Sequence, residues 1–127
     1  MNRYRKNPVG AHYGMRPWLL QRLTAVVMGL YTVVLLACLL ARPPASQADL
    51  RALFAGGFFR VATMLAALAL LYHAWVGLRD ILMDYVKPAG VRLAFESLVG
   101  LVLLGYAVWA AALLWGLPAS AVLGGGR

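Results

Sequence analysis

The chain has 127 residues, of which 63% are hydrophobic and only 13% are charged, and its formal net charge is +8. A soluble globular domain carries charge on about a quarter of its residues, so the composition excludes that class. The basic residues lie at the ends of apolar segments rather than together on one soluble surface, which excludes a nucleic-acid-binding face and is typical of membrane helices.

Three apolar segments contain no Asp, Glu, Lys or Arg, namely residues 23–41, 61–78 and 97–126. Each has about 18 residues or more, which at about 1.5 Å per residue is enough to cross a hydrocarbon core of about 30 Å. Helices satisfy their own backbone hydrogen bonds in lipid, so we predict an all-α membrane protein with three transmembrane helices. We expect residues 1–127 to form a single domain.

The first predicted element is a polar N-terminal arm, residues 1–16, followed by a helix over 17–41. Pro17 suits the first position of a helix. Two consecutive prolines, Pro43 and Pro44, follow the last apolar residues and end the helix.

A short amphipathic segment follows. Leu50, Leu53 and Phe54 recur at helical spacing, and Ser46 or Gln47 precedes them as a candidate cap. We therefore predict a short interfacial helix that ends at a Gly-Gly pair. The second and third transmembrane helices are predicted over 58–86 and 91–115, joined by a short turn.

The Lys and Arg residues predict the orientation of the helices. With three spans, the N-terminal arm and the turn between the second and third helices share one side, and eight of the twelve Lys and Arg lie there. The positive-inside rule then predicts a cytoplasmic N-terminus and a periplasmic C-terminus.

The second predicted transmembrane helix carries a histidine, His73, within an apolar run. Asp80 and Asp84 follow seven and eleven residues later, which places both within about 20° of His73 on a helical wheel. Ala66 and Ala69 share this side of the helix. Asp84 lies about 16 Å further along the axis, so His73 lies near the middle of the bilayer if Asp84 is at the headgroups.

A polar group within a membrane helix is a functional-site hypothesis by default. Three interpretations of His73 stay open from spacing alone: a hydrogen bond to a neighbouring helix, a proton relay, or axial ligation of a haem iron. The only other histidine, His12, lies in the polar arm, so a haem with two histidine ligands would require a partner chain.

Further polar residues lie near the predicted membrane surface. Asp84 and Tyr85 could bind and protonate a quinone, or form part of an ordinary aromatic belt with a solvated acid. Arg22 could pair with a haem propionate or extend to the surface. Arg16 lies on the same side.

The stretch "HAWVGLRDILMDYVKP", residues 73–88, resembles the second-helix signature of the hydrophobic membrane anchor of bacterial succinate dehydrogenase (complex II). In that family a histidine of the HAWxG motif is followed eleven and twelve residues later by an Asp-Tyr pair. The first-helix stretch "QRLTAVVMGLY", residues 21–31, is similar to the family's Arg-x-Thr-Ala segment. The resemblance covers residues 16–115, although the third helix matches only as an apolar helix and carries no quoted motif.

The resemblance implies a role for each matching residue. His73 would be an axial ligand of haem b, and Arg22 would approach a haem propionate. Tyr85 would donate a hydrogen bond to ubiquinone, supported by Asp84. Arg16 stands where some members have a histidine near a propionate, so a propionate contact by Arg16 is a further expectation.

The resemblance also implies partners and a location. The chain would be a non-catalytic subunit in a bacterial inner membrane, with a cytochrome b-type sister anchor subunit, an iron–sulfur subunit and a flavoprotein subunit as partners. Two alternatives stay open: an anchor of a quinol:fumarate reductase, and a structural three-helix membrane protein without a cofactor. The motif gives no role to Asp80.

Overall fold

The computed structural model describes residues 15–116, and these residues form helices joined by short turns. The helices are α1 (Met15–Ala41), α2 (Gln47–Ala55), α3 (Gly57–Tyr85) and α4 (Ala89–Leu114). Three of them, α1, α3 and α4, are long and apolar enough to cross a membrane. The predicted all-α membrane fold, with a short helix between the first two spans, is therefore confirmed over the described residues. The predicted polar arm lies outside them, except for its last two residues.

The bounds of the long helices differ from the predicted ones by at most two residues, and the end of α1 at Ala41 agrees. The largest shifts are at the beginnings of α1 and α4, which start at Met15 and Ala89 rather than at 17 and 91. Pro17 therefore lies within the first turn of α1. Its missing backbone N–H costs no hydrogen bond there, because the first N–H groups of a helix have no partner within the helix. Pro88 precedes α4 as its N-cap with a φ of −68°.

A capping box fixes the start of α2. The Ser46 side chain accepts a hydrogen bond from the backbone N–H of Asp49 at 3.2 Å, and Asp49 Oδ2 accepts one from the Ser46 N–H at 3.0 Å. Asp49 Oδ2 also accepts the N–H of Ala45 at 3.1 Å. Of the two candidate caps, Ser46 is the one used, and the reciprocal bonds satisfy backbone donors that would otherwise be free at a helix start.

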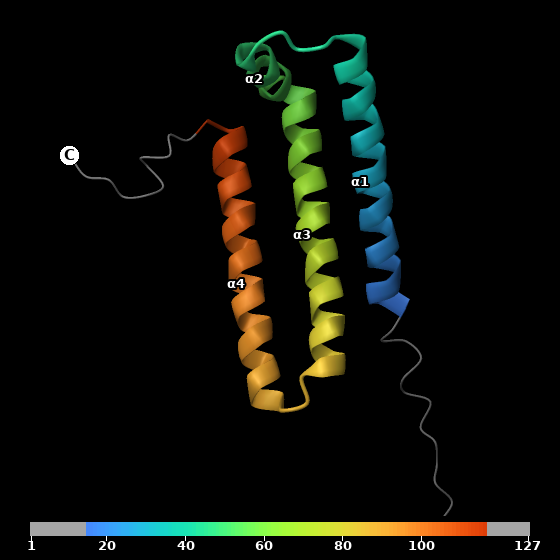
Figure 1. Cartoon of the computed structure of the whole chain (residues 1–127), viewed down its shortest axis with the longest axis vertical. Coiled ribbons are helices and arrows are strands. Elements are labelled where there is room, and N and C mark those ends of the chain that lie inside the picture. The colour runs from blue at the N-terminus through green and yellow to red at the C-terminus, as the bar shows by residue number, and fades with distance from the viewer. Residues whose placement is uncertain (1–14, 117–127) are drawn as a thin grey trace, which may run out of the picture.

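The long helices run roughly alongside one another, with α3 between α1 and α4 (Figure 1). The principal contacts of the structure join α3 to each of the other helices. A site formed between two of these helices is therefore expected to include residues of α3.

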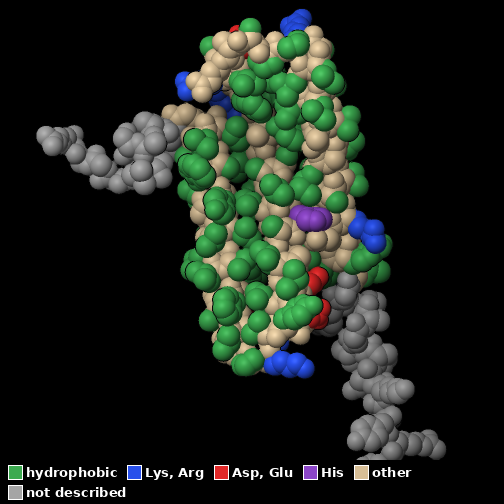
Figure 2. All heavy atoms as spheres, viewed as in Figure 1, with side chains coloured by type: hydrophobic (Ala, Val, Ile, Leu, Met, Phe, Trp, Pro, Cys, Tyr) green, Lys and Arg blue, Asp and Glu red, His purple; other side chains and the backbone are tan. Residues whose placement is uncertain are grey.

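The packed interior consists of small side chains. The buried hydrophobic residues are Ala66, Ala69, Val76 and Ala112, whereas most of the described leucines are exposed. Hydrophobic side chains cover much of the face shown in Figure 2. Ala66 and Ala69 belong to the small-residue side predicted for α3. Small side chains let helix backbones approach closely, which is a usual basis of helix packing in membranes.

Two further contacts hold α3 to its neighbours. The Tyr31 hydroxyl lies 2.7 Å from Thr63 Oγ1, which forms a hydrogen bond between α1 and α3. On the other side of α3, the Trp75 ring packs against Gly100 of α4, where an added Cβ would lie 3.4 Å from the ring. Glycine thus gives the indole room against α4.

Candidate functional site: a polar groove between α1 and α3

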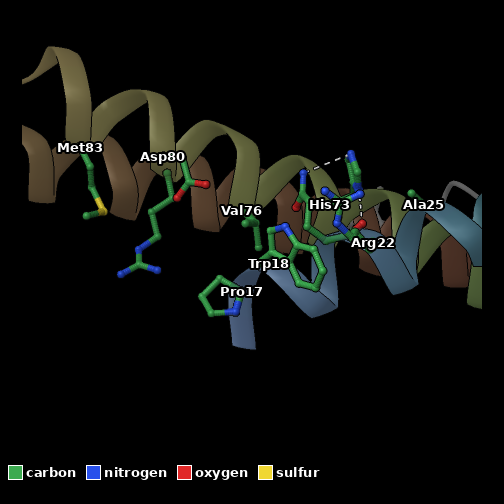
Figure 3. Close-up of a pocket in the computed structure, with 10 residues that line it drawn as sticks. Pro17, Trp18, Arg22, Ala25, His73, Val76, Asp80 and Met83 are labelled. Atoms are coloured by element: carbon green, nitrogen blue, oxygen red, sulfur yellow. Dashed lines mark hydrogen bonds between the residues drawn. The ribbon is translucent and has the colours of Figure 1, made fainter. Parts of the chain in front are cut away.

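A groove of about 680 Å³ lies between α1 and α3 and contains His73 (Figure 3). In Figure 2 the histidine is visible about midway along the molecule, with acidic side chains nearer its lower end. The lining residues from α1 are Pro17, Trp18, Gln21, Arg22 and Ala25, and those from α3 are His73, Val76, Arg79, Asp80 and Met83. The groove thus combines apolar walls with an imidazole, an amide, two guanidinium groups and a carboxylate.

The His73 ring is held by α1. Its Nδ1 lies 3.2 Å from the backbone carbonyl oxygen of Gln21 and 3.2 Å from Thr24 Oγ1. Its Nε2 lies 3.2 Å from Nε2 of the Gln21 side chain. Both ring nitrogens therefore have partners on one turn of α1, and these partners fix the orientation of the imidazole.

The partners also indicate which ring nitrogen carries the proton. A carbonyl oxygen only accepts hydrogen bonds, so the contact with Gln21 requires a proton on Nδ1 of His73. The single hydroxyl proton of Thr24 is directed to the carbonyls of Leu20 and Gln21, at 2.9 and 3.0 Å, which leaves its oxygen free to accept. Nε2 then carries the lone pair, to which the Gln21 amide donates. A metal would bind at this nitrogen.

Only the nitrogen of the Gln21 side-chain amide has a hydrogen-bond partner in this arrangement. Its Oε1 is buried and has no hydrogen-bond partner among the described residues. Leaving a buried acceptor unpaired costs about 1–3 kcal/mol. The contact between Gln21 and His73 Nε2 is therefore one that a stronger ligand for Nε2 could displace.

Arg22 lies at the same groove. Its guanidinium carbon lies 4.4 Å from the centre of the Trp18 ring, one turn earlier in α1. A cation–π contact of this kind holds the guanidinium against the ring while leaving its N–H donors available. The groove thus presents a positive group to an anionic ligand, as Figure 3 shows for Arg22 beside His73.

The structure brings together only some of the residues singled out in the sequence. His73, Arg22 and Asp80 line the groove. Asp84 and Tyr85, at the end of α3, do not line it, and Tyr85 is 83% exposed. Arg16 is exposed and is likewise outside the groove.

Sequence reasoning gave no role to two residues of this site, Gln21 and Thr24 of the quoted first-helix stretch, which supply the hydrogen-bond partners of the imidazole. The feature of the sequence that could have indicated them is their polarity near the start of an apolar helix. Their spacing of three residues puts them on one side of α1.

Three membrane-crossing helices and a polar groove around an intramembrane histidine define a multi-pass membrane protein with a site on its central helix. The family model described as succinate dehydrogenase/fumarate reductase transmembrane subunit matches residues 2–114, and the chain belongs to this family. The resemblance noted in the sequence is thereby confirmed at the level of the family.

A named relative agrees with the family match. The chain is 42% identical over 102 residues to a succinate dehydrogenase hydrophobic membrane anchor subunit of Coxiella burnetii. The matched region covers 80% of this chain and 89% of the relative. The similarity therefore extends over nearly the whole length of that anchor subunit.

Proposed function

We propose that the chain is the hydrophobic membrane anchor of a succinate:ubiquinone oxidoreductase and that His73 is one of two axial ligands of a haem b. The observation that carries the proposal is the hydrogen bonding of the imidazole. Nδ1 donates to the main chain of α1, which leaves the Nε2 lone pair directed to a groove that also holds Arg22. An outer hydrogen bond from the non-ligating nitrogen is the usual arrangement of a metal-binding histidine.

The other residues of the groove fit a haem. The guanidinium of Arg22 could pair with a propionate, while Val76, Ala25 and Trp18 offer apolar surface to the ring. When bound, the haem would supply one-electron transfer. The only histidine besides His73 is His12, in the predicted polar arm, so we assign the second ligand to a sister anchor subunit. Arg16 is a weaker candidate for a propionate because it lies outside the groove.

We place the ubiquinone site at the end of α3, at Asp84 and Tyr85. Both side chains are exposed in the chain, and a phenol beside a carboxylate can donate a hydrogen bond to a quinone carbonyl and support its protonation. Their exposure favours a site completed by another subunit. In this proposal the same surface contacts the iron–sulfur subunit, which in turn carries the flavoprotein subunit.

The proposed location is a bacterial inner membrane. The excess of Lys and Arg in the N-terminal arm and in the turn after α3 favours a cytoplasmic N-terminus and a periplasmic C-terminus. The quinone site would then face the cytoplasm.

The test is the haem content of the complex purified with this chain. His73→Ala should abolish or strongly alter the b-type signal in a reduced-minus-oxidised spectrum, because it removes the ligating nitrogen. Tyr72→Phe, at the neighbouring position of α3, is the matched control and should leave the signal unchanged. An unaltered spectrum and haem-to-protein ratio in His73→Ala would show that His73 is not a ligand.

A further inference from the structure

A second polar groove lies at the opposite end of the molecule from Asp84 and Tyr85. It has a volume of about 550 Å³ and is lined by Arg51 of α2 and Arg60 in the first turn of α3. Apolar side chains complete it, among them Leu50, Phe54, Leu113 and Trp115. Figure 1 shows α2 and the end of α4 together at this end.

The two arginines present an unsatisfied positive charge. The Nε atom of Arg60 is buried and has no hydrogen-bond partner among residues 15–116. A buried donor without an acceptor is rare in native structures, and a charged one is the least favourable case. Arg51 lines the same groove, so its positive charge adds to that of Arg60 rather than compensating it.

No Asp or Glu side chain lines this groove, and none forms an ion pair with Arg51 or Arg60 among the described residues. It contains only four Asp and Glu residues, all of them described. Asp80, Asp84 and Glu96 lie toward the other end of α3 and α4. Asp49 lies at this end, but its Oδ2 accepts the backbone N–H groups of Ala45 and Ser46. None of the four acidic side chains therefore accepts a hydrogen bond from Arg60 Nε.

We propose that this groove binds the phosphate of an anionic phospholipid. Arg60 lies in the first turn of one membrane-crossing helix and Trp115 follows the end of another, so both lie at the depth of the headgroups. A guanidinium group binds phosphate oxygens with paired N–H donors. The apolar walls suit the first part of an acyl chain, and two arginines without an acid favour a headgroup with net negative charge. This inference does not rest on the haem or the quinone.

The test uses the complex purified with this chain, stripped of bound lipid by detergent exchange. Dioleoyl phosphatidylglycerol is titrated in, dioleoyl phosphatidylcholine serves as the zwitterionic comparison, and bound lipids are counted by native mass spectrometry. We expect one phosphatidylglycerol to be retained in preference to phosphatidylcholine. Arg60→Gln should weaken its retention about fivefold, as expected for the loss of one basic group near a lipid surface.

Arg42→Gln is the matched control, because Arg42 lies at the same end of the molecule but lines a different groove. It should leave phosphatidylglycerol retention unchanged. If Arg60→Gln does not assemble, Arg51→Gln in the exposed helix α2 tests the same groove and should show a similar loss.

Three results would overturn the proposal. Equal retention of the two lipids by the unmodified complex would remove the preference for an anionic headgroup. Equal losses in Arg60→Gln and Arg42→Gln would show a general effect of surface charge. Binding of inorganic phosphate in the same mass spectra, with no lipid retained, would show that the ligand is a free ion.

Discussion

The hydroxyl oxygen of Thr24 lies 3.2 Å from Nδ1 of His73, across the interface between α1 and α3. The Gln21 carbonyl oxygen lies at the same distance from Nδ1, so one ring proton has two acceptors on one turn of α1. The imidazole is therefore oriented by a helix other than its own. Any motion of α1 relative to α3 would change the direction of the Nε2 lone pair.

Replacing Thr24 with valine should weaken haem retention without abolishing it. Valine keeps the shape of the side chain but removes one of the two acceptors, while the Gln21 carbonyl remains. Loss of an outer hydrogen bond to a metal-binding histidine typically lowers affinity about 10- to 100-fold, and we expect the lower end of that range. The measurement is the haem-to-protein ratio of the purified complex. Thr32→Val removes a hydroxyl that bonds only to Met28 of its own helix, and equal losses in both variants would contradict the role of Thr24.

Replacing Gln21 with leucine should make haem binding tighter. The Gln21 amide occupies His73 Nε2 and leaves its own Oε1 buried without a partner among the described residues, so it competes with any ligand of that nitrogen. A net hydrogen bond contributes about 0.5–1.5 kcal/mol, which corresponds to a gain of roughly 2- to 10-fold. Transfer of haem to an excess of a haem-scavenging protein measures the change, and Gln21→Ala controls for side-chain volume. Faster haem loss in both variants would show that Gln21 helps to hold the group.

Gly100→Leu should destabilise the packing of α4 on α3. A Cβ at Gly100 would lie 3.4 Å from the Trp75 ring, so alanine is tolerated but a branched side chain forces the helices apart. Overpacking of this kind costs about 1–3 kcal/mol. Gly105→Leu is the control, because a Cβ there meets nothing within 4 Å. The midpoint of unfolding in a denaturing detergent should fall for Gly100→Leu and stay unchanged for Gly105→Leu.

Tyr85→Phe should slow quinone reduction while leaving succinate oxidation with a soluble dye intact. The substitution removes only the hydroxyl that we propose donates to the quinone, and loss of such a donor slows a reaction by roughly 100-fold. Tyr106→Phe removes another exposed phenol, from the second half of α4, and should have no effect. A parallel loss in the quinone and dye assays would instead indicate defective assembly.

The charge distribution predicts the sidedness of the chain. A reporter enzyme that is active only in the periplasm should be active when it is fused after Arg127. A fused fluorescent protein that requires the cytoplasm for folding should stay dark. The reverse pattern would move the Asp84–Tyr85 end to the other side of the membrane.

Much of the fold could be predicted because its signals are local. Apolar length predicted the three spans, and the polar residues before α2 predicted a cap, of which the structure uses Ser46. The errors lay at the beginnings of α1 and α4, where proline is compatible both with the first turn of a helix and with the residue before it.

The site was only partly predictable because it depends on how α1 is rotated against α3. The helical wheel correctly put His73 and Asp80 together, since both belong to one helix. The wheel also included Asp84, but the groove does not extend beyond Met83 in α3. Gln21 and Thr24 became visible only when the facing turn of α1 was known, because no spacing within one helix specifies its partner on another.

The open packing of the helices also affects the stability of this chain in the membrane. No large side chain is fully buried anywhere in residues 15–116, so the helices enclose no sealed interior that could hide the imidazole and the guanidinium groups. Copies without a companion subunit would therefore expose polar atoms sideways to lipid, which is unfavourable. We therefore expect the stability of this chain in the membrane to depend on companion subunits that cover its open side.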